Sequence, residues 1–323
     1  MSTERSYHFD NIKFFLILLV MLGHAIEPLI NQSTWLKSLY MSIYLFHMPA
    51  FIFVSGYFSK SLKLSRICRL ILLYLLFNTL FLIFNHWIYQ WPLTFNYVTP
   101  YWIMWFLMSM VFWQLLNPLF KRISYGLMVA IVLGIGVGYM DSIGYQFSLS
   151  RTLVFFPFFL GGSLISKERM QRIIAFSGRF KIVSRVLLIT LPLIVMQTPL
   201  IHWLPGSLYG SFAYAKLGMT DWYAGFYRLF LYAVAFVLII ITFSAIPQQQ
   251  TICSSMGTRT MYAYILHGFI IKWFVVSPYF NAFSGNYVLL LLATSLLCCV
   301  LTSPIVSVFK PLVELVNPFK SKP

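Results

Sequence analysis

Charged side chains are scarce in this 323-residue sequence. Asp, Glu, Lys and Arg make up only 9% of the residues, against about 25% in an ordinary soluble domain. Hydrophobic residues make up 60%, and the mean hydropathy is +0.81. So little polar surface excludes a soluble globule of this size, and it equally excludes a disordered chain or a collagen-like fibre. A polytopic integral membrane protein is the class that remains.

The sequence also has few cysteines and lacks two common catalytic motifs. Four cysteines occur, with no C-x-x-C spacing and no neighbouring histidine, so neither a zinc site nor a disulfide framework is indicated and no metal is expected. The phosphate loop G-x-x-x-x-G-K-[ST] and the elbow G-x-S-x-G are missing as well. Any chemistry therefore has to come from ionisable side chains inside the membrane spans.

Long apolar runs predict an all-α membrane bundle of about ten transmembrane helices. A hydrocarbon core of about 30 Å needs roughly 17–25 apolar residues per helix, and the runs are continuous rather than alternating, which disfavours a barrel. The predicted spans are 12–30, 39–58, 67–88, 102–119, 124–140, 149–166, 182–201, 224–246, 261–277 and 287–309.

The distribution of Lys and Arg predicts cytoplasmic N- and C-termini. With that orientation, 18 of the 23 basic residues lie on the cytoplasmic side, a strong positive-inside asymmetry. The formal net charge of +16 therefore reflects topology, and no nucleic-acid partner is expected. The longest connections, 167–185 and 201–223, are too short for a soluble domain, so residues 1–323 are expected to form a single transmembrane domain in the bilayer.

The first span carries three ionisable residues whose burial in lipid needs a reason. His24 and Glu27 are three residues apart and share a helix face, and Asp10 lies within about 40° of that face. A carboxylate beside an imidazole fixes its tautomer and suits it to act as a general base. A histidine that is merely hydrogen-bonded within a helix bundle is an equally good interpretation of this pattern.

Other spans offer weaker candidates. His47 precedes Pro49, which should kink the second span, and either packing or a substrate hydrogen bond would explain it. Arg66 and Arg69 form one cationic face suited to phosphates, although ordinary anchoring at the cytoplasmic face is the stronger interpretation from spacing alone. Arg151 lies at the outer side, where it either snorkels or pairs with an acid such as Asp141 or Glu27.

Two aromatic residues and one further histidine are the remaining candidates for functional residues. Tyr264 and His267 in the ninth span are three residues apart and share a face. Trp105, at the outer edge of the fourth span, could stack on a sugar ring, although interfacial packing is the commoner role of such a residue.

Several of these residues stand in an order that resembles the acyltransferase-3 family of membrane acyltransferases, and its fucose 4-O-acetylase-like branch in particular. The matching pieces run from about residue 5 to 300. They are listed here in chain order: Phe9-Asp10-Asn11-Ile12-Lys13, Gly23-His24, Glu27-Pro28, Phe46-His47-Met48-Pro49, Phe53 to Phe58, Arg66-Ile67-Cys68-Arg69, Trp105-Phe106-Leu107, Arg151 to Gly161, and Ser255 to His267.

The resemblance implies transfer of an acyl group, commonly acetyl, from cytoplasmic acyl-CoA to a hydroxyl of a cell-envelope or exported carbohydrate. Arg66 and Arg69, with Lys13, would hold the phosphates of the donor. His24 would be the general base or would relay the acyl group, tuned by Glu27 and Asp10. His47, Arg151, Trp105, Tyr264 and His267 would contact the substrate.

The resemblance further implies a multi-pass protein of the bacterial plasma membrane. Its acceptor would be an exopolysaccharide, glycolipid or wall polymer, and envelope-polysaccharide synthesis proteins would be its partners. Many relatives have Arg where this chain has Lys13, and many carry an extra esterase-like domain that is not expected here. An exporter or flippase of lipid-linked sugar is the alternative function, although no internal repeat of the transporter kind is evident. A scaffold for an envelope synthase is a third interpretation, in which His24 would be dispensable.

Overall fold

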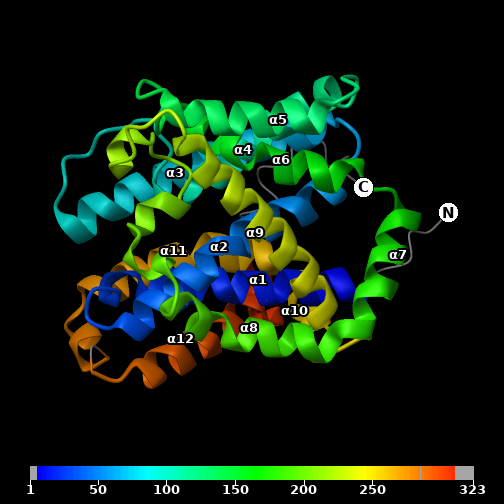
Figure 1. Cartoon of the computed structure of the whole chain (residues 1–323). Coiled ribbons are helices and arrows are strands. Elements are labelled where there is room, and N and C mark those ends of the chain that lie inside the picture. The colour runs from blue at the N-terminus through cyan, green and yellow to red at the C-terminus, as the bar shows by residue number, and fades with distance from the viewer. Residues whose placement is uncertain (1–5, 284, 310–323) are drawn as a thin grey trace, which may run out of the picture. The chain divides into compact units, whose positions relative to one another are not determined.

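The computed structural model describes residues 6–283 and 285–309, and its regular structure is helical (Figure 1). No strand occurs in these ranges, so the all-α prediction is confirmed for them. The α-helices are α1 (Tyr7–Ile26), α2 (Thr34–Tyr57), α3 (Leu64–Tyr89), α4 (Trp105–Phe120), α5 (Gly126–Gly136), α6 (Leu149–Leu164), α7 (Lys167–Ser177), α8 (Lys181–Met196), α9 (Ala224–Ala245), α10 (Ile252–Met256), α11 (Thr260–Val276) and α12 (Tyr287–Thr302).

The lengths of the helices identify a multi-pass membrane protein. Within the described ranges, six helical segments are long and apolar enough to cross a bilayer: Tyr7–Leu29, Thr34–Tyr57, Leu64–Tyr89, Trp102–Phe120, Gln146–Leu164 and Ala224–Ala245. Three shorter apolar helices are Gly126–Tyr139, Thr260–Val276 and Tyr287–Thr302. With α8, a helix occupies each of the ten predicted ranges. The count of ten spans and the cytoplasmic termini remain predictions, and Arg5, Lys310, Lys320 and Lys322 lie outside the described residues.

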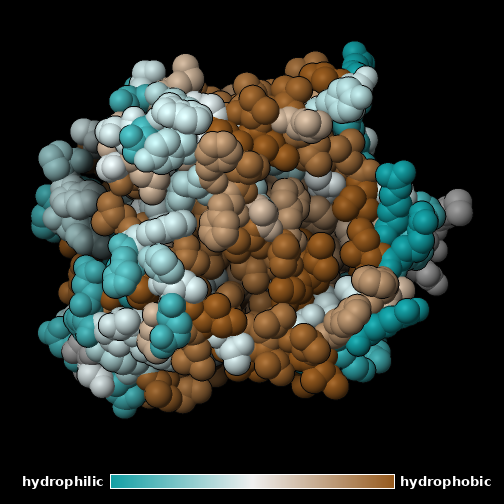
Figure 2. Space-filling view, in the orientation of Figure 1, coloured by the Kyte–Doolittle hydropathy of each residue, from teal (hydrophilic) through white to brown (hydrophobic). Residues whose placement is uncertain are grey.

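The connection expected at 167–185 contains an amphipathic helix, α7. Its N-terminus is capped by Ser166, whose hydroxyl accepts a hydrogen bond from the backbone N–H of Arg169 at 3.2 Å. The apolar residues Met170, Ile173 and Ile174 follow a helical period, and Met170 is buried. Figure 2 shows hydrophilic surface over α7 and mainly hydrophobic surface over the middle of α8. A polar, basic segment can therefore be a helix where one face is covered.

The chain divides into two compact units, and the first comprises Met1–Val54, Ile165–Trp203 and Leu231–Val306. In this unit α1 packs against α10, α11 and α12 (Figure 1). The approach to α10 is close, since a Cβ on Gly257 would lie only 1.9 Å from the carbonyl oxygen of Asp10. A residue without a side chain is therefore required directly after α10.

Asn11, which is 3% exposed, fixes the start of α1 within the first unit. Its Nδ2 donates to the carbonyl oxygens of Pro247 at 2.9 Å and Gln249 at 3.0 Å. Its Oδ1 accepts hydrogen bonds from Thr251 Oγ1 and Ser254 Oγ, both at 2.7 Å. A buried amide with donor and acceptor both satisfied joins α1 to the segment that links α9 and α10.

The second unit comprises Ser55–Leu164, Leu204–Phe230 and Ser307–Pro323. Helix α4 packs against α3 and α6, and α5 packs against α6. The indole Nε1 of Trp113 donates to the carbonyl oxygen of Thr152 at 2.8 Å, which joins α4 to α6. The end of α2 touches α6 so closely that a Cβ on Gly56 would lie 2.0 Å from the carbonyl oxygen of Phe159. Glycine is required at this crossing because no side chain fits.

Candidate functional site

A polar cluster at the end of α1, within the first unit, contains the strongest candidate from the sequence. His24 lies in the last turn of α1, and Glu27 follows in the short 3-10 helix η1 (Glu27–Leu29). The Nδ1 atom of His24 is 3.4 Å from Glu27 Oε2 and also 3.4 Å from the hydroxyl of Tyr44 on α2. The side chain of His24 is 15% exposed and that of Glu27 36%. The spacing of three residues therefore brings carboxylate and imidazole together.

A second histidine lies on the other side of His24. The rings of His24 and His267 stack with centroids 5.6 Å apart and 20° between their planes. His267, on α11, is fully buried, and its Nδ1 lies 2.8 Å from the carbonyl oxygen of Ala263. Because a carbonyl only accepts hydrogen bonds, Nδ1 carries the hydrogen, and Nε2 is the atom through which this ring can act. Tyr264 lies next to it, at 6.4 Å between ring centroids.

Helix α2 contributes His47 and Tyr44 to the cluster. His47 is buried, and its Nδ1–H donates to the carbonyl oxygen of Ile43 at 2.7 Å. The ring of Tyr44 lies between neighbours, with centroids 4.0 Å from Tyr40 and 4.8 Å from His47. Gly23 makes room for it on α1, since a Cβ there would lie 3.0 Å from Tyr44 Cε2. Tyr44 is thus confined within reach of His24.

The cluster provides the parts of a general-base site. A carboxylate that accepts the Nδ1–H of an imidazole fixes the tautomer in which Nε2 has a lone pair. Glu27 and His24 have that relation, and the hydroxyl of Tyr44 lies at the same nitrogen. Glu27 also interacts electrostatically with Lys272 on α11, so a positive charge helps to hold the carboxylate. The arrangement can take a proton from a hydroxyl that approaches His24.

Asp10, the third predicted catalytic residue, lies at the opposite end of α1. Fourteen residues separate it from His24, which corresponds to about 21 Å along a straight helix. Its carboxylate binds Lys13 Nζ at 2.8 Å instead. The structure therefore does not bring Asp10 to His24, and it neutralises Lys13, one of the cations predicted for the donor.

Arg66 belongs to a buried polar network in the second unit. Its NH1 group donates to Ser59 Oγ at 3.1 Å, and Gln114 Nε2 donates to the same oxygen at 3.2 Å. Asn117 Nδ2 donates to the carbonyl oxygen of Ser59 at 3.1 Å, and Ser163 Oγ donates to Asn117 Oδ1 at 2.6 Å. These contacts fix the position of the Arg66 guanidinium at the start of α3.

Arg69 lies one turn further along α3 and is exposed. No hydrogen bond or ion pair engages its side chain within residues 6–283 and 285–309. One arginine of the predicted pair is therefore anchored, and the other is available to an anion.

Arg151 is held by aromatic rings and backbone in the second unit. Its guanidinium lies 5.1 Å from the ring centroid of Trp105 and 5.3 Å from that of Tyr145. Its Nε donates to the carbonyl oxygen of Tyr209 at 3.2 Å, and NH2 donates to Ser211 Oγ at 3.4 Å. Arg151 and Trp105, both predicted to contact substrate, thus touch each other and tie the segment 204–223 to α6 and α4.

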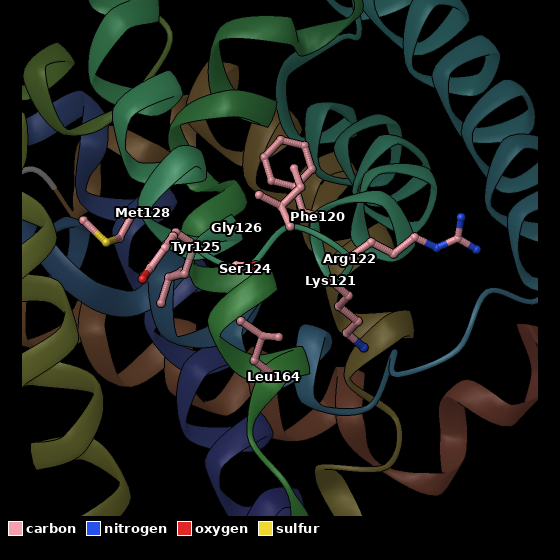
Figure 3. A pocket seen from close by; sticks show the side chains of 10 residues that line it. Phe120, Lys121, Arg122, Ser124, Tyr125, Gly126, Met128 and Leu164 are labelled. Atoms are coloured by element: carbon pink, nitrogen blue, oxygen red, sulfur yellow. The ribbon is translucent and has the colours of Figure 1, made fainter.

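A pocket of about 360 Å³ lies at the turn between α4 and α5 and is lined in part by Lys121 and Arg122 (Figure 3). Burial lowers the pKa of Lys121, and the charge of Lys60 lowers it further. Figure 3 shows Lys121 and Arg122 extending to one side of the turn and Tyr125 and Met128 to the other. Because these side chains diverge, the pocket does not gather its charges around one ligand.

Several residues of these sites escape sequence reasoning. Tyr44 could have been found from its position three residues before His47, on the same helix face. Lys272, Ser59 and Asn11 carry no local signal, because their partners are distant in the sequence. In the described part of the chain, no three His, Cys, Asp or Glu residues are grouped so that they could hold a metal ion.

A partly buried carboxylate–histidine pair lies among apolar helices in a multi-pass membrane protein. The chain belongs to the acyltransferase-3 family, since the sequence model of that family, described as an acyltransferase domain, matches residues 6–304. The resemblance to this family that was inferred from the sequence is thereby confirmed.

Two curated relatives are similar to part of the chain. Nodulation protein NolL of Mesorhizobium japonicum is 43% identical over 68 residues, which cover 20% of this chain and 18% of that protein. Nodulation protein NolL of Sinorhizobium fredii is 39% identical over 72 residues, which cover 21% of this chain and 20% of that protein. The matching stretch spans about a fifth of the length of these relatives. No solved structure matches the chain.

Proposed function

We propose that the protein is an O-acyltransferase, and specifically an O-acetyltransferase, that moves an acyl group from cytoplasmic acyl-CoA to a hydroxyl of an envelope or exported carbohydrate. The observation that carries the proposal is the position of His24, with Glu27 and Tyr44 at Nδ1 and His267 stacked on its ring. Ionisable groups are costly inside a membrane, so three of them gathered around one imidazole support a chemical role.

The proposed reaction uses that geometry in two steps. Nε2 of His24 takes the proton of the acceptor hydroxyl while its oxygen attacks the thioester carbonyl carbon, and a C–O bond forms. Collapse of the tetrahedral intermediate breaks the C–S bond, and the leaving thiolate takes the proton back from His24. Glu27 holds the tautomer of the ring and supports the imidazolium that forms between the two steps. Surrounding helices exclude water that would hydrolyse the thioester.

The donor is bound, on this proposal, by the cations of α3. The phosphates of acyl-CoA are anionic and cannot cross lipid, so a cationic mouth on the cytoplasmic side is required. Arg66 is fixed by Ser59, and Arg69 is exposed beside it, which suits one anchored and one mobile contact to phosphate. Lys13 is a further proposed contact of the donor, for which it would exchange its ion pair with Asp10 for a phosphate.

The acceptor is proposed to approach the cluster from the outer side of the membrane. His47, Tyr264 and His267 are proposed to contact the acceptor in the first unit. Trp105 with Arg151 is proposed to present an aromatic and cationic surface to a sugar. We further propose that both units act as one transmembrane domain in the bacterial plasma membrane, with the termini in the cytoplasm. Exopolysaccharide, glycolipid or wall polymer is the proposed acceptor, and envelope-polysaccharide synthesis proteins are proposed partners.

The test compares His24→Ala with His202→Ala, a matched variant at an exposed histidine in the 3-10 helix Pro199–His202. O-acetyl groups on the isolated glycan are measured by NMR, and the amounts of membrane protein and exported glycan are measured in parallel. We expect His24→Ala to remove O-acetylation while export continues, and His202→Ala to change neither. Intact O-acetylation with arrested export in His24→Ala would refute the proposal in favour of transport.

A further inference from the structure

An apolar pocket of about 460 Å³ lies within the first unit, and none of the histidines lines it. Its walls come from α1, α2, α8 and the segment 245–247 that follows α9. Leu19, Phe46 and Leu188 are typical of the lining. The volume lies within the range of about 300–1,000 Å³ usual for small-molecule sites. Acyl transfer as proposed above assigns nothing to this pocket.

Arg185 is the charged residue of the lining, and it is partly immobilised. It lies in the second turn of α8, and its Nε donates to the carbonyl oxygen of Ala245 at 2.9 Å. No carboxylate pairs with it in residues 6–283 and 285–309, and its two terminal amino groups make no hydrogen bond there. A guanidinium held by one nitrogen presents the other two as a preorganised fork for an oxyanion.

The surface around the pocket is the kind that faces hydrocarbon. On α8, Ile182, Val186 and Ile189 are all exposed, with Ile189 at 77%, and Figure 2 shows mainly hydrophobic surface over the middle of this helix. Pro192, which lines the pocket, has no N–H and leaves the carbonyl of Leu188 without its helical donor. The pocket therefore combines an apolar body, one backbone acceptor and a cation near the start of α8.

We propose that this pocket binds an anionic phospholipid of the bilayer, with one acyl chain against Leu19, Phe46 and Leu188 and the phosphate on the terminal amino groups of Arg185. The chemistry on both sides is complementary, because an anionic phospholipid offers a long apolar chain and an oxyanion in one molecule at the membrane surface. Predicted topology puts Arg185 at the cytoplasmic leaflet, where anionic lipids and basic pockets between helices meet. The proposal is independent of the acceptor and donor of acyl transfer.

The test measures phosphatidylglycerol and phosphatidylcholine retained by the detergent-purified full chain, by native mass spectrometry and by lipid titration. Wild type is expected to retain phosphatidylglycerol in preference to phosphatidylcholine. Arg185→Gln should weaken phosphatidylglycerol binding at least tenfold, and Leu188→Trp, which fills the pocket, should weaken both lipids. Arg172→Gln, at an exposed arginine of α7 outside the pocket, is the matched control and should bind as wild type.

Two results would overturn the proposal. Equal retention of the two lipids, or wild-type binding by Arg185→Gln, would remove the arginine from the site. Glycerol phosphate that competes as strongly as the intact lipid would show a site for phosphate alone, without the acyl chain. If Leu188→Trp fails to fold, Arg185→Lys replaces it. Its charge should preserve the preference for anionic lipid while the affinity falls, so loss of the preference or an unchanged affinity contradicts the proposal.

Discussion

Substitution of Gly23 by alanine probes how closely Tyr44 is fixed against His24. The added Cβ would lie 3.0 Å from Tyr44 Cε2, whereas ordinary contacts begin at 3.4 Å, so the ring must move by about 0.4 Å. Tyr40 and His47 confine that ring at centroid distances of 4.0 and 4.8 Å. Its hydroxyl is already 3.4 Å from His24 Nδ1, so an equal displacement of the hydroxyl away from this nitrogen would take the contact to about 3.8 Å, beyond hydrogen-bonding range.

The expected cost is that of one ordinary hydrogen bond to the ring of His24. Such a bond contributes about 0.5–1.5 kcal/mol, which corresponds to a decrease of about 2- to 12-fold in kcat. The assay is transfer of radiolabelled acetyl from acetyl-CoA to glycan in membrane vesicles, with protein amount measured by immunoblot. Gly136→Ala in α5 is the matched control, because a Cβ there meets nothing within 4 Å.

A double-mutant cycle separates this route from a general distortion of α1. Tyr44→Phe alone should lower kcat by the same factor, and adding Gly23→Ala to Tyr44→Phe should cost less than about twofold more, since no hydroxyl contact remains to be lost. A Gly23→Ala effect of full size in the Tyr44→Phe background would refute the reasoning.

Three further predictions concern donor binding and stability. Arg69→Gln should raise KM for acetyl-CoA by about tenfold at unchanged kcat, with the difference shrinking as salt increases; an unchanged KM at low salt removes this arginine from the donor site. Gly56→Ala should abolish recovery of folded protein in gel filtration, because Phe159 leaves no space for a Cβ, whereas Gly136→Ala should be recovered normally. Asn11→Leu loses four hydrogen bonds of about 0.6 kcal/mol each in a membrane protein, so unfolding should become easier by about 2 kcal/mol, measured as a lower Tm. An unchanged Tm would show that the network contributes nothing.

Sequence reasoning works for features that local periodicity determines. The apolar runs predict helices at all ten ranges, because a spanning helix must satisfy its own backbone and be apolar along its whole length. The spacing of His24 and Glu27 predicts their contact, because residues three apart share a helix face. Helix α7 was missed because its charged residues suggested a loop, although Ser166 and Met170 mark its cap and its covered face.

Local periodicity does not predict contacts between residues that are distant in the sequence. Asp10 shares the helical face of His24, but the same helix separates the two by about 21 Å, so periodicity without distance is misleading. His267 is 243 positions from His24 and meets it only because α11 packs on α1. The roles of Ser59 and Asn11 depend on partners from other helices in the same way.

Chemical rescue of His24→Ala tests the central claim, that the imidazole of His24 moves the proton in acyl transfer. The purified variant in nanodiscs is assayed for acetyl transfer with and without added imidazole, which fits the space left by the side chain. We predict a loss of about 10²–10⁴-fold that imidazole partly restores with saturable dependence on its concentration, while wild type is unaffected. A variant that transfers acetyl at the wild-type rate without imidazole would contradict the account.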